Sequence, residues 1–122
     1  MQEIAFLDAT SLVARLKSKE ISSRELLEHY LSRVDRINPD INAIICMQVE
    51  KARARADEAD AALARGEDWG PLHGLPMTVK ESFDITGLPT TWGDPLLREN
   101  IANSNAVACQ RLQNAGAIIF GK

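Results

Sequence analysis

Two continuous apolar runs of strand length, residues 43–47 and 117–121, place the strongest constraint on how this chain folds. Such runs are typical of strands covered on both faces, because a strand with one wet face alternates apolar and polar residues. A third short run, residues 76–80, lies between them, and helical patterns separate the three. Strands that alternate with helices predict a layered α/β fold.

Start signals for two helices stand close together near the N-terminus. Asp8 precedes the apolar spacing of the first helix, and Ser22 with Glu25 forms the capping-box pattern that begins the second. Asn38-Pro39 is expected to end the second helix, because the residue before a proline disfavours helical geometry. The sequence therefore predicts an amphipathic helical pair over about residues 8–38.

Two more helical patterns lie between the apolar runs. Residues 48–65 are rich in alanine and charge, which predicts a helix that lies close on a sheet while its charged face stays solvated. Arg53 and Asp57 have the spacing of an ion pair on that face. Ser104 or Asn105 is the expected cap of a last short helix.

The bulk composition is that of an ordinary globular domain. Of the 122 residues, 45% are hydrophobic and 25% charged, so we expect one domain over 1–122, with the sheet and its helices over about residues 43–122. The net charge of −3 offers no basic footprint for nucleic acid. Small-molecule chemistry or protein contacts are the expected functions.

Targeting and redox patterns narrow the class further. No stretch approaches the ~18 apolar residues of a membrane span, and the first residues have no apolar signal core, so we expect no membrane association and a cytoplasmic location. Cys46 and Cys109 are far apart in sequence, which favours two buried reduced thiols over a disulfide or a metal site. No cofactor and no metal are expected.

Lys80 is the residue that most suggests chemistry. Read as a strand, residues 76–80 place Met77 and Val79 on one side and Thr78 and Lys80 on the other. A lysine fixed there by the backbone is either paired or partly desolvated, and desolvation lowers its pKa.

Lys80 could act as a base only if its surroundings favour the neutral amine. From an ordinary pKa of about 10.4, loss of the proton at pH 7 costs roughly 4.6 kcal/mol. Walls formed by Leu75, Met77, Val79 and Phe83 could supply the desolvation. The ordinary alternative is that Lys80 reaches water, as most lysines at strand ends do.

Several motifs in order give the chain a recognisable pattern. They are residues 21–27 (ISSRELL), 38–43 (NPDINA), 70–83 (GPLHGLPMTVKESF), 87–93 (GLPTTWG) and 112–122 (LQNAGAIIFGK). Together they resemble the N-terminal part of the amidase signature family, over essentially the whole chain. Several matches in register are far more specific than one short motif. The resemblance implies the α/β/α fold of that family, with a mixed central sheet and flanking helices, incomplete in this chain.

The resemblance also implies a reaction and a role for Lys80. Family members hydrolyse carboxylic amides with a serine nucleophile, a second serine in a cis peptide bond and a lysine, and the lysine falls on Lys80. It would accept a proton from the bridging serine, which takes one from the nucleophile. The substrate would be a small-molecule amide.

The serines of that triad are not found in this sequence. The Gly/Ser-rich segment that carries them in the family is expected beyond Lys122, which makes the chain a fragment. Its own serines lie in helices or caps, and Ser82 lacks a glycine-rich turn. We therefore expect the chain alone to be catalytically inert.

Two alternative functions stay open. In glutamyl-tRNA amidotransferases, the A subunits often have Asp-Asn after the lysine, whereas Glu81-Ser82 follows Lys80 here, which is closer to stand-alone amidases. The second alternative is a non-catalytic interaction module that uses the helical pair and an exposed sheet edge. A homo-oligomer is compatible with either the module or the enzyme.

Other polar and aromatic residues have ordinary structural interpretations. His73 and His29 lack the spacing of a metal site, so structural roles are expected. Trp69 and Trp92 flank the lysine segment and could wall a pocket, Trp92 more readily, although packing beside loops is commoner. Glu81 should point away from Lys80, because neighbours in a strand face opposite sides.

Overall fold

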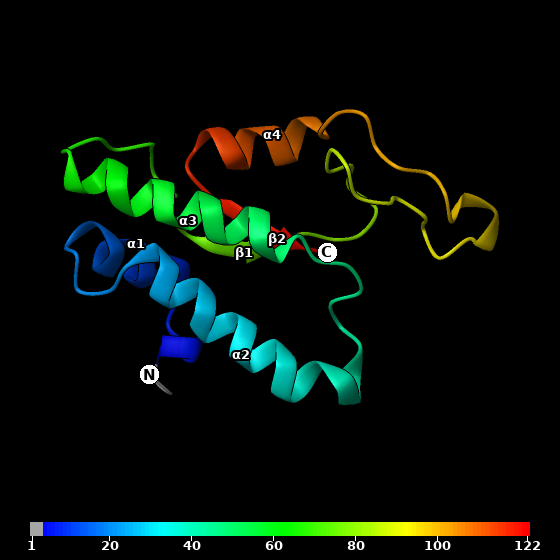
Figure 1. Cartoon of the computed structure of the whole chain (residues 1–122), viewed down its shortest axis with the longest axis horizontal. Helices are drawn as coiled ribbons and strands as arrows, with labels where there is room; N and C mark the ends of the chain where they lie inside the picture. The colour runs from blue at the N-terminus through cyan, green and yellow to red at the C-terminus, as the bar shows by residue number, and fades with distance from the viewer. Residues whose placement is uncertain (1–3) are drawn as a thin grey trace.

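The computed structural model describes residues 4–122, which form helices around a small parallel sheet (Figure 1). The helices are α1 (Ala9–Lys17), α2 (Ser23–Ile41), α3 (Val49–Ala64) and α4 (Val107–Asn114), and the strands are β1 (Pro76–Thr78) and β2 (Ile118–Gly121). Short 3-10 turns cover Ile4–Phe6 and Pro95–Leu97. The α/β fold class predicted from the sequence is confirmed.

Strand β2 is the centre of the sheet. It pairs in parallel with β1, with Pro76 opposite Ile118 and Met77 opposite Ile119. On its other edge, Met47 forms an antiparallel bridge to Gly121. Among the residues that the structure describes, the mixed pairing implied by the family resemblance is thus present only as a single antiparallel bridge beside the two parallel strands.

Both faces of β2 are buried, in agreement with its continuous apolar sequence. Ile118 and Phe120 pack with Leu27 of α2 and with the alanines of α3, whereas Ile119 packs with Ile85 and Cys109 in a separate cluster. Successive residues of a strand point to opposite faces, so two layers cover β2.

Helix α3 lies close to β2 through a stripe of small residues. The buried members of the stripe on α3 are Ala52, Ala56, Ala59 and Ala62. Alanine adds little bulk and keeps high helix propensity, so the helix approaches its neighbours closely without interior glycine. The predicted alanine-rich helix is confirmed.

The start signals of α1 and α2 are confirmed, but the expected end of α2 is wrong. Asp8 caps α1, and Ser22 and Glu25 form the complete capping box of α2. Helix α2 continues through Pro39 to Ile41, and Asn42 ends it in the left-handed conformation with φ 48°. Pro39 cannot donate a backbone hydrogen bond to the preceding turn, and the helix ends two residues after it.

Residues 43–47 do not form the strand that their apolar sequence predicted. Their backbone instead runs extended beside β2: the Ile45 N–H donates to the Lys122 carbonyl at 2.9 Å, and Lys122 N–H donates to the Cys46 carbonyl at 2.9 Å. Ile45 is 56% exposed, so the segment is covered on one face only. Its apolar sequence does not reveal this half-exposure.

Three smaller expectations are corrected by the contacts. Strand β1 ends at Thr78, so Lys80 lies beyond it. Helix α4 has no side-chain cap, because Asn105 accepts hydrogen bonds from Thr86 instead. Arg53 pairs with Glu28 of α2 and with Glu50, rather than with Asp57, because the facing helix offers a carboxylate at 2.7 Å. That ion pair holds the pKa of the Glu28 carboxyl at about 2.

The two cysteines differ in burial, although the sequence predicted that both would be buried. Cys46 and Cys109 are both free thiols; Cys109 is buried and Cys46 is half-buried. Burial raises the pKa of both thiols. Among residues 4–122, none of the helices combines the length and apolarity that crossing a bilayer demands.

The alanine stripe generates a prediction about stability. Ala56→Leu should lower the free energy of unfolding by about 1–3 kcal/mol, because the larger side chain overpacks a fully buried position. Ala61→Leu is the matched control, since Ala61 is exposed on the same helix. Urea unfolding of both variants measures the difference, and equal stabilities would show that α3 does not pack through this stripe.

Candidate active site around Lys80

Lys80 lies just after β1, at the start of a turn. Its carbonyl accepts a hydrogen bond from the Phe83 N–H at 3.1 Å. The preceding Val79 N–H donates to the Gly121 carbonyl at 3.2 Å, which attaches the lysine segment to the end of β2. The backbone at Lys80 is thus held, while its side chain is exposed.

The predicted alternation along this segment is confirmed, but the predicted apolar wall is not formed. Met77 and Val79 pack against the cluster that contains Ile119, and Lys80 faces the other way. Leu75 belongs instead to the cluster beneath the first two helices, and Phe83 is 41% exposed. The apolar neighbours in sequence therefore pack away from the lysine.

Glu81 binds the following loop rather than Lys80. Its carboxylate accepts hydrogen bonds from the backbone N–H groups of Thr91 and Trp92. Burial raises the pKa of Glu81, but these hydrogen bonds outweigh it and leave the pKa below its ordinary value. The expectation that Glu81 points away from Lys80 is consistent with these contacts.

Trp92 stands on the surface of that loop. It is 73% exposed and has a positive φ of 55°, a conformation that costs a non-glycine residue free energy. The two hydrogen bonds to Glu81 hold the backbone there. The part of the loop around the 3-10 turn Pro95–Leu97 extends away from the helices (Figure 1), whereas Ile85 is buried against Cys109 of α4.

Lys122 is a buried charge that the sequence analysis missed. It is 3% exposed, and its Nζ donates to the carbonyls of Glu81 and Pro89 and to Thr90 Oγ1. The one available signal was its position directly after the apolar residues of β2. A lysine at the end of a sequence gives no other sign that a loop folds over it.

His73 has a structural role, whereas Nε2 of His29 is buried and has no hydrogen-bond partner among residues 4–122. His73 is buried; its Nδ1 accepts a hydrogen bond from the Trp69 N–H, and its Nε2 lies 2.9 Å from the Ala59 carbonyl. Trp69 packs against His73 and under the guanidinium of Arg55, so it joins the core rather than a pocket near Lys80. Among residues 4–122, no group of three His, Cys, Asp or Glu side chains is arranged to hold a metal ion.

The serines with assigned contacts support the backbone. Ser22 caps α2, Ser18 donates to the Arg15 carbonyl, and the buried Ser23 hydroxyl donates to the Gly74 carbonyl at 2.6 Å. Within residues 4–122, no hydrogen bond joins Lys80 to a serine.

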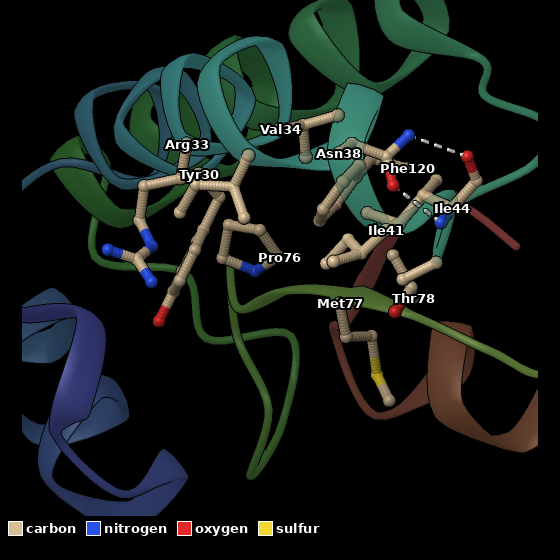
Figure 2. A pocket seen from close by; sticks show the side chains of 12 residues that line it. Tyr30, Arg33, Val34, Asn38, Ile41, Ile44, Pro76, Met77, Thr78 and Phe120 are labelled. Atoms are coloured by element: carbon tan, nitrogen blue, oxygen red, sulfur yellow. Dashed lines mark hydrogen bonds between the residues drawn. The ribbon is translucent and has the colours of Figure 1, made fainter.

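An apolar groove of about 310 Å³ lies between α2 and β1 (Figure 2). Tyr30 and Val34 of α2 form one side, and Pro76 and Thr78 of β1 form the other. Asn38 closes one end, where its side chain exchanges two hydrogen bonds with the Ile44 backbone. Lys80 and the turn that follows it are not among the residues that line this groove.

Comparison with known proteins identifies this arrangement. The family model described as Amidase matches residues 25–122, which include most of helix α2 and the lysine turn. The chain belongs to the amidase signature family. The resemblance inferred from the sequence motifs is confirmed.

Relatives of this amidase-family chain include stand-alone enzymes and amidotransferase components. An acylamidase of Rhodococcus erythropolis is 40% identical over 121 residues, which cover 99% of this chain and 25% of the acylamidase. The A subunit of the glutamyl-tRNA(Gln) amidotransferase of Nitrosococcus oceani is 40% identical over 111 residues, which cover 91% of this chain and 23% of that relative.

Solved structures show the same fold. The native peptide amidase of Stenotrophomonas maltophilia superposes with a TM-score of 0.84 at 32% identity, over 94% of this chain and 24% of the peptide amidase. The chain therefore spans about a quarter of the length of the relatives it matches.

The exposure of Lys80 generates a prediction about stability. Lys80→Ala should change the free energy of unfolding of the 122-residue chain by less than about 0.5 kcal/mol, because the exposed side chain has no partner to lose. Ser23→Ala should cost about 1–3 kcal/mol, because it leaves the buried Gly74 carbonyl unpaired. Chemical unfolding of both variants is the measurement; a large loss in Lys80→Ala would mean that the lysine is a structural residue.

Proposed function

We propose that the chain contributes Lys80, as the general base, to an amidase that hydrolyses carboxylic amides. The observation that supports this most is the family match over residues 25–122, together with the lysine motif at residues 70–83. The fixed backbone on the N-terminal side of Lys80 adds support, because a base must be held in place relative to the group it deprotonates.

The proposed reaction moves one proton along two serines before the carbonyl is attacked. Neutral Lys80 Nζ takes a proton from the bridging serine, which takes the proton of the nucleophilic serine. The nucleophile's oxygen then forms a bond to the amide carbon, and backbone N–H groups bind the oxyanion. When the C–N bond breaks, the proton returns from Lys80 through the bridging serine to the leaving amine. Water then attacks the acyl-enzyme in place of the amine, and the same steps in reverse release the acid and restore the nucleophilic serine.

Both serines, in this proposal, come from sequence that the described residues do not supply. Lys80 would then lose its exposure when that polypeptide covers the turn, and the loss of water would favour the neutral amine that a base requires. The apolar side chains predicted to wall it face away, so the desolvation has to come from the covering segment. The small-molecule amide substrate and the cytoplasmic location belong to the same proposal.

A second candidate is the A subunit of a glutamyl-tRNA amidotransferase. The 40% identity to the Nitrosococcus oceani relative supports it. The chemistry at Lys80 would be the same, but ammonia would be released from glutamine and activity would depend on partner proteins. Hydrolysis of simple amides without any partner distinguishes the stand-alone amidase from the amidotransferase component.

A chimera tests the proposal directly. When this chain replaces the matching quarter of the Rhodococcus erythropolis acylamidase, the product should hydrolyse simple aryl or alkyl amides. Lys80→Ala in the chimera should lower kcat by about 10²–10⁴-fold, because general base catalysis is lost. Steady-state kinetics measure the effect.

The controls separate the base from the scaffold. Lys51→Ala, at an exposed lysine on α3, should leave kcat unchanged. The 122-residue chain by itself should show no hydrolysis. A folded chimera that is inactive, a chimera whose activity survives Lys80→Ala, or activity in the isolated chain would each contradict the proposal.

A further inference from the structure

Lys122 is a buried cation that the proposed reaction does not use. Its Nζ donates to the Pro89 carbonyl at 2.8 Å, to Thr90 Oγ1 at 3.0 Å and to the Glu81 carbonyl at 3.2 Å. A lysine ammonium has three N–H donors, so all of them have a partner here. Each acceptor belongs to the loop that follows Lys80.

That loop is closed into a ring by Glu81. The Glu81 carboxylate accepts from the N–H groups of Thr91 and Trp92, while its carbonyl accepts from Lys122. Residues 81–92 are therefore tied together at both ends, with the Lys122 ammonium inside. The loop has no α-helix or strand of its own, but Ile85 is buried with Ile119 and Cys109, and Pro89 forms a bridge to Ile101. The polar contacts of Lys122 and Glu81 add the attachments that lie next to Lys80.

Lys80 lies between two attachments to the same end of β2. On its N-terminal side, the Val79 N–H donates to the Gly121 carbonyl. On its C-terminal side, the Glu81 carbonyl accepts from Lys122, the next residue of the chain. One dipeptide thus holds the backbone both before and after Lys80.

The dipeptide is itself fixed by the segment that follows α2. The Lys122 N–H donates to the Cys46 carbonyl, and the Lys122 carbonyl accepts from the Ile45 N–H. A Cβ at Gly121 would lie 2.7 Å from the Cys46 carbonyl oxygen, so only glycine permits this close approach. The backbone that carries the Lys122 side chain is therefore held in place.

Packing alone does not require a charge at this place. Burial of an ammonium costs free energy, which neutral acceptors offset only when the geometry is good, and an apolar side chain of the same length would fill the space at less cost. What an apolar side chain could not do is bind three loop oxygens at once. The charge is therefore suited to ordering the loop.

We propose that Lys122 is a positioning residue for Lys80: its ammonium orders residues 81–90 and so fixes the backbone from which Lys80 projects. The catalytic importance of that order rests on the proposed function of Lys80. The positioning itself is a property of this chain and can be measured without any reaction.

The test uses the isotopically labelled 122-residue chain in solution. In the parent chain, the backbone ¹⁵N order parameter of Lys80 should lie near 0.85, and in Lys122→Met it should fall below about 0.6. Amide exchange at Phe83, Thr91 and Trp92 should accelerate about 10-fold or more. The reason is that the loop loses the three hydrogen bonds that the Lys122 ammonium donates to it. Amides of α2 and α3 should keep their parent rates.

Two further variants keep the result decisive. Lys51→Met, at an exposed lysine, is the matched control and should change none of these values. Thr90→Val removes one acceptor and keeps the ammonium, so it should accelerate the same amides by a smaller factor; it decides the matter if Lys122→Met does not fold.

The outcomes separate this proposal from the proposed function. In an active chimera, Lys122→Met should lower kcat about 10-fold or more with little change in KM, because a misplaced base slows the chemical step. An inactive chimera would count against the role of Lys80 alone. A Lys80 backbone as ordered in Lys122→Met as in the parent, an unchanged loop in Thr90→Val, or a loss of order spread through the whole chain would overturn the positioning role of Lys122.

Discussion

Successive carbonyls at the end of β2 point to opposite edges of the strand. Those of Phe120 and Lys122 accept from Gln48 and Ile45 on one edge, whereas that of Gly121 accepts from Val79 on the other. Because α3 and the Ile85 cluster bury both faces of β2, the strand cannot shift or rotate without exposing its side chains. Strand β2 is therefore held by apolar packing on both faces, and its hydrogen bond to Val79 positions the lysine turn.

Two lysines at the ends of adjacent strands have opposite environments. Lys80 follows β1 with a held backbone and an exposed ammonium, whereas Lys122 follows β2 with a buried ammonium that binds three oxygens. The Lys80 ammonium is accessible to a reacting group, whereas all three donors of the Lys122 ammonium are used in hydrogen bonds to the loop. This division suits a site in which one cation performs chemistry and the other maintains the geometry.

The sequence predicted those parts of the fold that depend on local patterns. The capping box of Ser22 and Glu25, the alanine stripe of α3 and the buried strand after Gly116 are all local, and the structure confirms them. Contacts between distant residues were less accessible. Arg53 pairs with Glu28 rather than with Asp57, and Lys122 contacts Glu81, which lies 41 residues earlier in the sequence. No spacing rule relates such partners.

The candidate site shows the same division. Motif order was enough to predict the family, and alternation was enough to predict which way Lys80 faces. The apolar wall around Lys80 was predicted wrongly, because neighbours in sequence were taken as neighbours in space. Val79 and Leu75 pack into two different clusters, neither of which covers the lysine.

The position of Lys80 depends on the contact between its backbone segment and the end of β2. Scalar coupling across the hydrogen bond between the Val79 amide nitrogen and the Gly121 carbonyl carbon measures this contact directly by nuclear magnetic resonance. We expect this coupling to be detectable. We also expect a stronger coupling between the Ile118 amide nitrogen and the Leu75 carbonyl carbon, because the Ile118 nitrogen lies 2.8 Å from the Leu75 oxygen. A Val79 amide that couples to another carbonyl, or that exchanges with solvent as fast as an unstructured peptide, would contradict this placement of Lys80.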